Sequence, residues 1–409
     1  MKIWMKLLLA AILGTALGLL LPAGSPTDGT LGILLELAVR IGRYIFLPLV
    51  FFSVSIAVFE LYEDRRMFLM VGKVVLVSVA SVFAAAIIGA AGAFLLRPDR
   101  IPLVSEAAAI APLASAGDIL LGLFPRNAFS ALVSGGDGMG PLLVLAVILG
   151  LAFSFDQSVT KPVVSLFDSL SRIMYQINSF FVELLAILAI LAAAANARAF
   201  MAVLRLNLYR GLLLTVGVEL LFALVIVIPL ILYFASGKKN PFRILYGLLG
   251  PALACVVSGD LFFAGGTLLK HAKESLGIRR RAGALCVPIA LLLGRAGTSL
   301  VTATSFIVVL NSFSNLGLSA GNFFWMLLFV PISALLLGAA PGRGPAAALA
   351  FLCGLYGRGF ETGYLLVAQA ALPLLLAGTL LDSVWAGCVA WMVARSEGMT
   401  EDRELRRFI

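Results

Sequence analysis

An apolar run over residues 243–270 is interrupted by the sequence SGDLFFAGG at residues 258–266. A second apolar run, over residues 322–358, is interrupted by GAAPGRGP at residues 338–345. Each half is too short to cross a bilayer, which takes about 20 apolar residues. Glycine and proline leave backbone groups that lipid cannot satisfy, so both breaks should be buried in protein or line a wet cavity. Two such segments in one chain predict re-entrant hairpins that meet at a binding site.

The composition places the whole chain in a membrane. Of the 409 residues, 61% are apolar and 12% are charged, whereas soluble domains carry about a quarter charged residues. These values exclude a soluble enzyme, a nucleic-acid-binding protein, a secreted disulfide scaffold and a disordered chain. The net charge of +9 comes from basic residues in short loops, which orient a multispan protein and are not a nucleic-acid patch.

Uninterrupted apolar runs predict the membrane-spanning helices. The first run follows lysines as a signal peptide would, but no small-x-small pattern ends it, which favours an uncleaved helix. Basic clusters beside several runs predict cytoplasmic termini in a bacterial inner membrane, with the first hairpin opening inward and the second outward. The connection 196–210 carries arginines on the predicted outer side and fits this topology least. The predicted spans are 5–22, 31–60, 67–96, 141–157, 163–195, 210–235, 284–311 and 363–394.

Several short motifs, in the same order and spacing as the predicted spans, carry a resemblance over nearly the whole chain. They are LAVR at 37–40 with LPLVF at 47–51, ILLGLFPRNAF at 119–129, the stretch from Pro288 to GTSL at 297–300, APGRG at 340–344 and AGTLLD at 377–382. Through them the chain resembles the dicarboxylate/amino acid:cation symporter family, the glutamate transporter homologues. The fold class that follows is an all-α polytopic membrane protein with eight transmembrane helices and two re-entrant hairpins.

The resemblance also implies an assembly and a motion. It implies a homotrimer in the lipid membrane, in which each protomer moves a small-molecule substrate by an elevator displacement. Residues 1–66 (helices 1 and 2) and 98–200 (helices 4 and 5) would form the scaffold. Residues 67–97 (helix 3) and 201–409 (helix 6, hairpin 1, helix 7, hairpin 2 and helix 8) would form the transport domain. No cofactor is implied, and the coupling ion would be sodium or a proton.

The candidate site follows from the hairpin tips and from the family's motifs on the seventh and eighth helices. Relatives hold sodium there, and by resemblance two of the family's sodium positions, both asparagine in relatives, fall on Gly294 and Asp382. The predicted substrate-binding residues are Ser258, Gly259, Asp260, Arg295, Thr298, Gly342, Arg343, Gly344, Thr379 and Asp382.

The motifs depart from the family where cations bind. The seventh-helix motif NMDGT of relatives reads GRAGT at 294–298, and the family's later eighth-helix aspartate falls on Ala386. The arginine that contacts a side-chain carboxylate in many relatives falls on Gly378. Sodium needs several oxygen ligands, so these departures predict that sodium coupling is weakened or lost, and proton coupling or exchange gains weight.

Charged side chains at membrane depth need partners, because each costs on the order of 3 kcal/mol or more when unpaired. We therefore predict that Arg295 replaces a bound cation and pairs with Asp382; the alternative is an arginine that snorkels to the interface. Arg343 is a substrate or gate contact, or else a solvated loop charge. Glu219 is the best candidate for a protonatable carboxylate, with a helix–helix hydrogen bond as the alternative.

The function that these observations favour is secondary transport of a small organic anion or amino acid. An anion-conducting channel and a divergent paralogue without transport are the alternatives. An enzyme ranks last, because the cysteines are isolated and the single histidine, His271, is interpreted as a solvated loop residue among Lys270, Lys273 and Glu274.

Overall fold

The computed structural model describes residues 1–21, 25–102, 116–133, 138–238, 240–313, 320–337, 344–357 and 359–409. Over these ranges the protein is helical, apart from an isolated antiparallel bridge between Ile278 and Thr400. Seven helices within the described residues are long and apolar enough to cross a membrane. The chain is thus an all-helical polytopic membrane protein, as its composition predicted.

The first half of the chain contains α1 (Ile3–Leu20), α2 (Ser25–Tyr44), α3 (Phe46–Glu63), α4 (Met67–Leu96), α5 (Ala116–Gly122), α6 (Ala128–Val133), α7 (Met139–Ala152) and α8 (Gln157–Arg205). The second half contains α9 (Arg210–Phe222), η1 (Ala223–Val227), α10 (Ile228–Ala235), α11 (Phe242–Gly247), α12 (Leu249–Ser258), α13 (Leu261–Glu274), α14 (Arg280–Leu293), α15 (Ala296–Phe313), α16 (Ala320–Leu337), α17 (Gly344–Tyr356), η2 (Gly363–Ala370), α18 (Ala371–Ser396) and η3 (Leu405–Arg407).

Two of the helices differ in length from the predicted spans. The predicted span 141–157 is α7, whose 14 residues fall short of the roughly 20 that cross a bilayer. The predicted span 163–195 belongs to α8, a helix of 49 residues that runs on through much of the connection 196–210. Pro162 is the sixth residue of α8, just past the first turn, so its missing N–H removes one helical hydrogen bond near the start of the helix.

The first interrupted segment is a helical hairpin, as predicted. The helices α12 and α13 contact each other on either side of the break. Gly259 adopts φ +66°, a left-handed conformation that glycine takes without strain and that ends α12. Asp260 then caps α13, since its side chain accepts the Phe263 N–H at 2.7 Å.

The second interrupted segment forms α16 and α17, which also contact each other. The connection between them, residues 338–343, lies outside the described residues, and with it lie the predicted site residues Gly342 and Arg343. Gly344 is described: it is buried and begins α17.

The predicted seventh span is broken, which its apolar pattern did not predict. Residues 284–311 belong to two helices, α14 and α15, that meet at Gly294 and Arg295. Gly297 lets α15 approach α18 closely, because an added Cβ there would overlap the carbonyl oxygen of Gly378. The break therefore places the N-terminus of α15 inside the protein, against the middle of α18.

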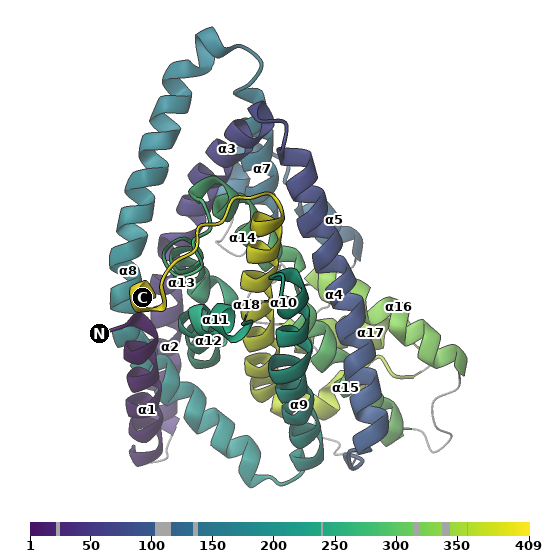
Figure 1. Cartoon of the computed structure of the whole chain (residues 1–409). Coiled ribbons are helices and arrows are strands. Elements are labelled where there is room, and N and C mark those ends of the chain that lie inside the picture. The colour runs from purple at the N-terminus through teal and green to yellow at the C-terminus, as the bar shows by residue number, and fades with distance from the viewer. Residues whose placement is uncertain are drawn as a thin grey trace.

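The helix α18 is central among the helices of the second half, where it contacts α12, α13, α14, α15 and α17 (Figure 1). The helices α1 and α2 pack along α8, at one side of the molecule, while α16 lies at the other side (Figure 1). Both chain ends lie together, and Lys2 Nζ donates to the carbonyl oxygen of Leu405 at 3.2 Å.

Candidate functional site

Asp382 is held by the N-terminus of α15. Its Oδ1 accepts the N–H groups of Gly297 at 2.6 Å and Thr298 at 3.1 Å, and its Oδ2 accepts the Thr298 hydroxyl at 2.7 Å. The first N–H groups of a helix lack partners within the helix and favour an anion. The fully buried carboxylate of Asp382 therefore serves as the cap that α15 lacks in its own sequence.

Arg295 lies at the break between α14 and α15 and is 3% exposed. Its Nη1 is 3.7 Å from Asp382 Oδ2, so the predicted ion pair is present. This distance is longer than a hydrogen bond, and the buried Nε of Arg295 has no partner among the described residues. Arg295 also interacts electrostatically with Asp260, at the tip of the first hairpin.

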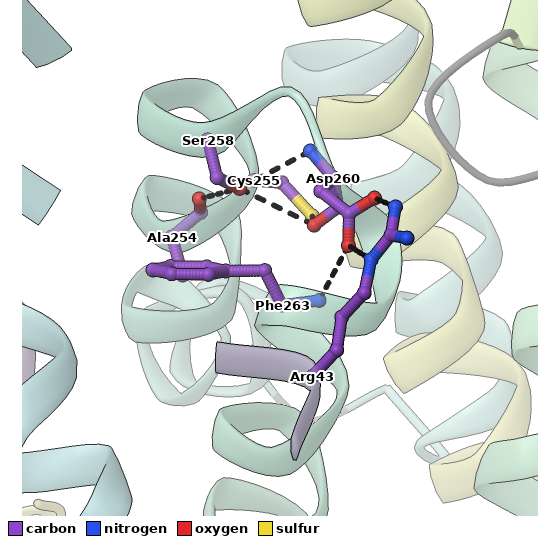
Figure 2. A network of polar contacts seen from close by, with 6 residues as sticks. All are labelled: Arg43, Ala254, Cys255, Ser258, Asp260 and Phe263. Carbon is purple, nitrogen blue, oxygen red and sulfur yellow. Dashed lines mark hydrogen bonds and ion pairs between the residues drawn. The ribbon is translucent and has the colours of Figure 1, made fainter. Parts of the chain in front are cut away.

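Asp260 is paired with Arg43, near the end of α2 (Figure 2). Arg43 donates through Nε to Asp260 Oδ1 at 3.0 Å and through Nη2 to Oδ2, which is the two-pronged geometry that guanidinium and carboxylate prefer. The Arg43 guanidinium also lies 5.9 Å from the ring centroid of Phe262. Two residues 217 positions apart in the sequence are thereby joined at the hairpin tip.

The hairpin tip also contains a short hydrogen-bond network (Figure 2). The Ser258 hydroxyl lies 2.7 Å from the Ala254 carbonyl oxygen and accepts the Asp260 N–H at 3.1 Å. Cys255 Sγ lies 3.8 Å from the Asp260 carbonyl oxygen. These bonds fix the tip around Gly259, so Ser258 and Gly259 shape the turn that presents Asp260.

The remaining predicted residues lie around this group without joining its polar contacts. The Thr379 hydroxyl donates along α18 to the Leu375 carbonyl oxygen at 2.8 Å. Gly294 ends α14, with its N–H donating to the Ala290 carbonyl oxygen at 2.7 Å. Gly344 packs against Leu375 of α18, since an added Cβ there would lie 2.8 Å from Leu375 Cδ1.

The group consists of two cations and two anions, Arg43, Asp260, Arg295 and Asp382, so its formal charges cancel. Each anion is also a helix cap, Asp260 for α13 and Asp382 for α15. The described residues contain no group of three or more His, Cys, Asp or Glu side chains placed to hold a metal ion. In this arrangement each carboxylate is neutralised by an arginine of the chain itself. Each also accepts hydrogen bonds from a helix N-terminus, so its oxygen atoms are already engaged.

Arg43 was missed by the sequence reasoning. It lies inside the predicted span 31–60, three residues after Arg40, and an arginine within an apolar run requires a partner. That requirement is the signal that would have marked it. The partner, Asp260, is 217 positions away. The sequence therefore indicates that Arg43 needs an anionic partner, but it does not indicate which residue that partner is.

The interpretation of His271 as a solvated loop residue is wrong. His271 lies within α13, is 1% exposed, and its Nδ1 is 3.0 Å from the Gly247 carbonyl oxygen. The charged residues that suggested a loop are the last turns of α13, and Lys270 is itself buried near Glu183 of α8. A helix that continues to Glu274 carries the imidazole into the packing against α11 and α12.

A family model described as "Sodium:dicarboxylate symporter family" matches residues 3–396. The chain belongs to the sodium:dicarboxylate symporter family. The resemblance predicted from the short motifs is thus confirmed, and this family of symporters is a family of transporters and not of enzymes. The glutamate-transporter fold follows from the family.

Two proteins to which the chain is similar share a name. Neutral amino acid transporter A of Homo sapiens is 26% identical over 221 residues, which cover 50% of this chain and 38% of that protein. Neutral amino acid transporter A of Bos taurus is 31% identical over 121 residues, which cover 29% of this chain and 22% of that protein. The matched stretches span well under half the length of these relatives.

Proposed function

We propose that this symporter-family protein is a secondary transporter of a small organic anion or amino acid in which sodium coupling is weakened or lost. The observation that supports it best is the guanidinium of Arg295, 3.7 Å from Asp382 Oδ2. By resemblance, this region is where relatives of the family hold sodium. In this proposal the fixed positive charge of Arg295 takes the place of a bound sodium ion.

The bonding of Asp382 supports the same proposal. A hard cation needs several oxygen atoms with free lone pairs directed at it. Asp382 instead accepts three donors from α15 and faces Arg295. Sodium at this carboxylate would meet N–H groups and a guanidinium in place of oxygen atoms, so its binding is disfavoured.

The substrate class follows from family membership and from the available charges. The proposed substrate carries a carboxylate, as dicarboxylates and amino acids do, and the names of the two relatives add neutral amino acids to this class. The proposed contacts are the hairpin tips with Arg295, Thr298, Thr379 and Asp382. Arg43, which the structure adds at the first tip, is a further cation that a carboxylate can meet when Asp260 moves away.

The proposed motion is an elevator displacement within a homotrimer, in a bacterial inner membrane with both termini cytoplasmic. In this proposal residues 1–66 and 98–200 stay fixed while 67–97 and 201–409 move. The Arg43–Asp260 pair would then join the two parts, because Arg43 belongs to the first and Asp260 to the second. It has to break whenever the hairpin travels.

The test is uptake by purified protein in proteoliposomes. Radiolabelled aspartate, alanine and succinate are offered with sodium or choline outside, and binding to the detergent-solubilised protein is followed by thermal shift under the same conditions. We expect saturable uptake whose rate changes less than about twofold when choline replaces sodium. Tight aspartate binding that requires sodium would overturn the proposal of lost coupling. Linear, voltage-driven flux would indicate a channel, and no flux at all would indicate a paralogue without transport.

A further inference from the structure

Glu219 is a buried carboxyl that the site described above does not use. It lies on α9, is 3% exposed, and contacts α4 and α15. Its Oε2 is 2.6 Å from Thr304 Oγ1, while its buried Oε1 has no partner among the described residues. A carboxyl in this position is expensive in the ionised form, because neither a cation nor a second donor compensates it.

The hydrogen-bond partners around Thr304 favour the protonated form of the Glu219 carboxyl over the ionised form. Thr304 Oγ1 lies near Glu219 Oε2 and also near the carbonyl oxygens of Leu300, at 3.1 Å, and Gly89, at 3.2 Å. A hydroxyl has one hydrogen to donate but can accept. When Glu219 carries a proton, it donates to Thr304 Oγ1, and the hydrogen of Thr304 then serves one of the two carbonyl oxygens. When Glu219 is ionised, it takes that hydrogen away from both.

The space for this carboxyl is built by α4. Gly92 faces it, and an added Cβ there would overlap Glu219 Oε1. Gly89, one turn earlier, gives α15 a close approach to the same place. The helices α4, α9 and α15 thus enclose the carboxyl. Its Oε1 lies against the backbone of α4 at Gly92, in space that a side chain at this position would fill.

No charged group compensates Glu219 within the described residues. Of the helices that contact α9, α15 has no charged side chain, and the Lys73 of α4 pairs with Glu397. On α18, Asp382 faces Arg295, and Arg395 donates to the Ser236 carbonyl oxygen at 2.9 Å. The remaining groups are the exposed Arg97, which follows the end of α4, and those at the start of α9, where Arg210 begins the helix and Asp99 lies against Gly211, about two helical turns before Glu219.

We propose that Glu219 is a proton-binding site that couples proton movement to transport. The inference rests on the proposed function and names the coupling ion for it. A hydronium ion gives up a proton to Glu219 Oε2, an O–H bond forms that donates to Thr304 Oγ1, and water is left; after the transport step the same O–H bond breaks and water on the other side accepts the proton. No other bond changes and no oxidant or reductant takes part.

The first experiment measures coupling in proteoliposomes with a pH-sensitive dye inside and a radiolabelled mixture of aspartate, alanine and succinate outside. The wild-type protein should accumulate label up to about tenfold for each pH unit of an inward proton gradient, for one proton per substrate. It should acidify the interior at the same time. Glu219→Gln keeps the shape of the neutral carboxyl and should lose both responses, while Glu36→Gln, at an exposed position of α2, should keep them.

Infrared spectroscopy provides a measurement that is independent of transport. The C=O stretch of a protonated carboxyl should be present in the wild-type protein and in Glu36→Gln, and missing in Glu219→Gln. If Glu219→Gln does not fold, Thr304→Val should shift the same band, because the partner of the carboxyl is gone.

The outcomes separate the two claims. Wild-type uptake without any response to the gradient overturns this inference and leaves the proposed function standing, as does a gradient response retained by Glu219→Gln. Absence of uptake under every gradient overturns the proposed function, and the infrared band alone then decides whether Glu219 holds a proton. A band that Glu219→Gln leaves unchanged overturns the site.

Discussion

The protein buries two arginine–aspartate pairs that are built differently. In the pair of Arg43 and Asp260 the guanidinium grips the carboxylate with two nitrogens. In the pair of Arg295 and Asp382 the closest approach is 3.7 Å, and the carboxylate takes its hydrogen bonds from Gly297 and Thr298 instead. The first is a directional contact between distant helices, whereas the second is a charge placed beside a carboxylate that the helix N-terminus already holds.

The two aspartates depend on different partners. Asp260 depends on an arginine from another part of the chain, and a single N–H of Phe263 remains when that arginine leaves. Asp382 keeps three donors without Arg295. We therefore expect the stability contributed by the Arg43–Asp260 pair to depend on which cation occupies position 43. The stability contributed by the Arg295–Asp382 pair should depend mainly on whether position 382 carries the carboxylate.

The largest effect is expected from Asp382→Ala. It leaves the Arg295 guanidinium buried without its nearest anion and removes the cap of α15, and breaking a buried pair in this way costs about 3–5 kcal/mol. Folded yield and thermal melting in detergent measure the loss. Asp382→Asn, which retains an acceptor oxygen, is the matched control and should melt closer to the wild type. Equal melting of Asp382→Ala and the wild type would contradict the structural role given to this carboxylate.

A smaller effect is expected from Arg43→Met. The Arg43 side chain is 20% exposed, so water reaches part of it and we expect a loss of about 2 kcal/mol, below the range for fully buried pairs. In a double-mutant cycle with Asp260→Asn, the two changes should not be additive. Additive changes in the free energy of unfolding would show that the two side chains do not interact in the protein in solution.

The same pair allows a test of motion. Cysteines at both positions, Arg43→Cys with Asp260→Cys, should be joined by a bifunctional methanethiosulfonate reagent that spans the length of the arginine side chain, since a direct disulfide needs closer Cβ atoms. The crosslink should stop uptake, because a fixed pair cannot separate, and reduction should restore it. The single variants, treated in the same way, are the controls. Uptake by fully crosslinked protein would mean that residues 1–66 and the hairpin tip do not separate during transport.

Arg295→Met should have a still smaller effect on stability, about 1–2 kcal/mol, because the hydrogen bonds of Asp382 remain. Its effect on ion dependence should be clearer: removing the fixed cation leaves a carboxylate that sodium can approach. Uptake and thermal shift measured in sodium and in choline should differ more for the variant than for the wild type. Activity and stability both unchanged would contradict the cation role of Arg295.

The smallest effect is expected from Arg43→Lys. Lysine keeps the charge but presents a single ammonium in place of the planar fork, so we expect a loss of about 1 kcal/mol, less than in Arg43→Met. Arg295→Lys is the comparison within the second pair, where no fork exists, and should be nearly neutral. A lysine at position 43 that costs as much as methionine would show that charge contributes little there.

Much of the architecture was predictable from the apolar pattern. The spans at 5–22, 67–96 and 210–235 and the break at residues 258–260 correspond to helices and to a turn at those places. The prediction of a pair between Arg295 and Asp382 came from the cost of charge in lipid and holds in the structure. Elsewhere the same pattern misled, because α7 is shorter and α8 longer than the apolar runs suggested.

From the amino-acid order alone it follows where the chain can cross a bilayer and where it must turn, because each unpaired backbone group and each unpaired charge in lipid costs free energy at its own position. The packed fold was needed to show that the seventh span breaks at Gly294 and Arg295, that His271 is buried, and that Arg43 meets Asp260. Each depends on which helix lies opposite. A polar side chain in an apolar run demands a partner, and the packing of distant helices selects it.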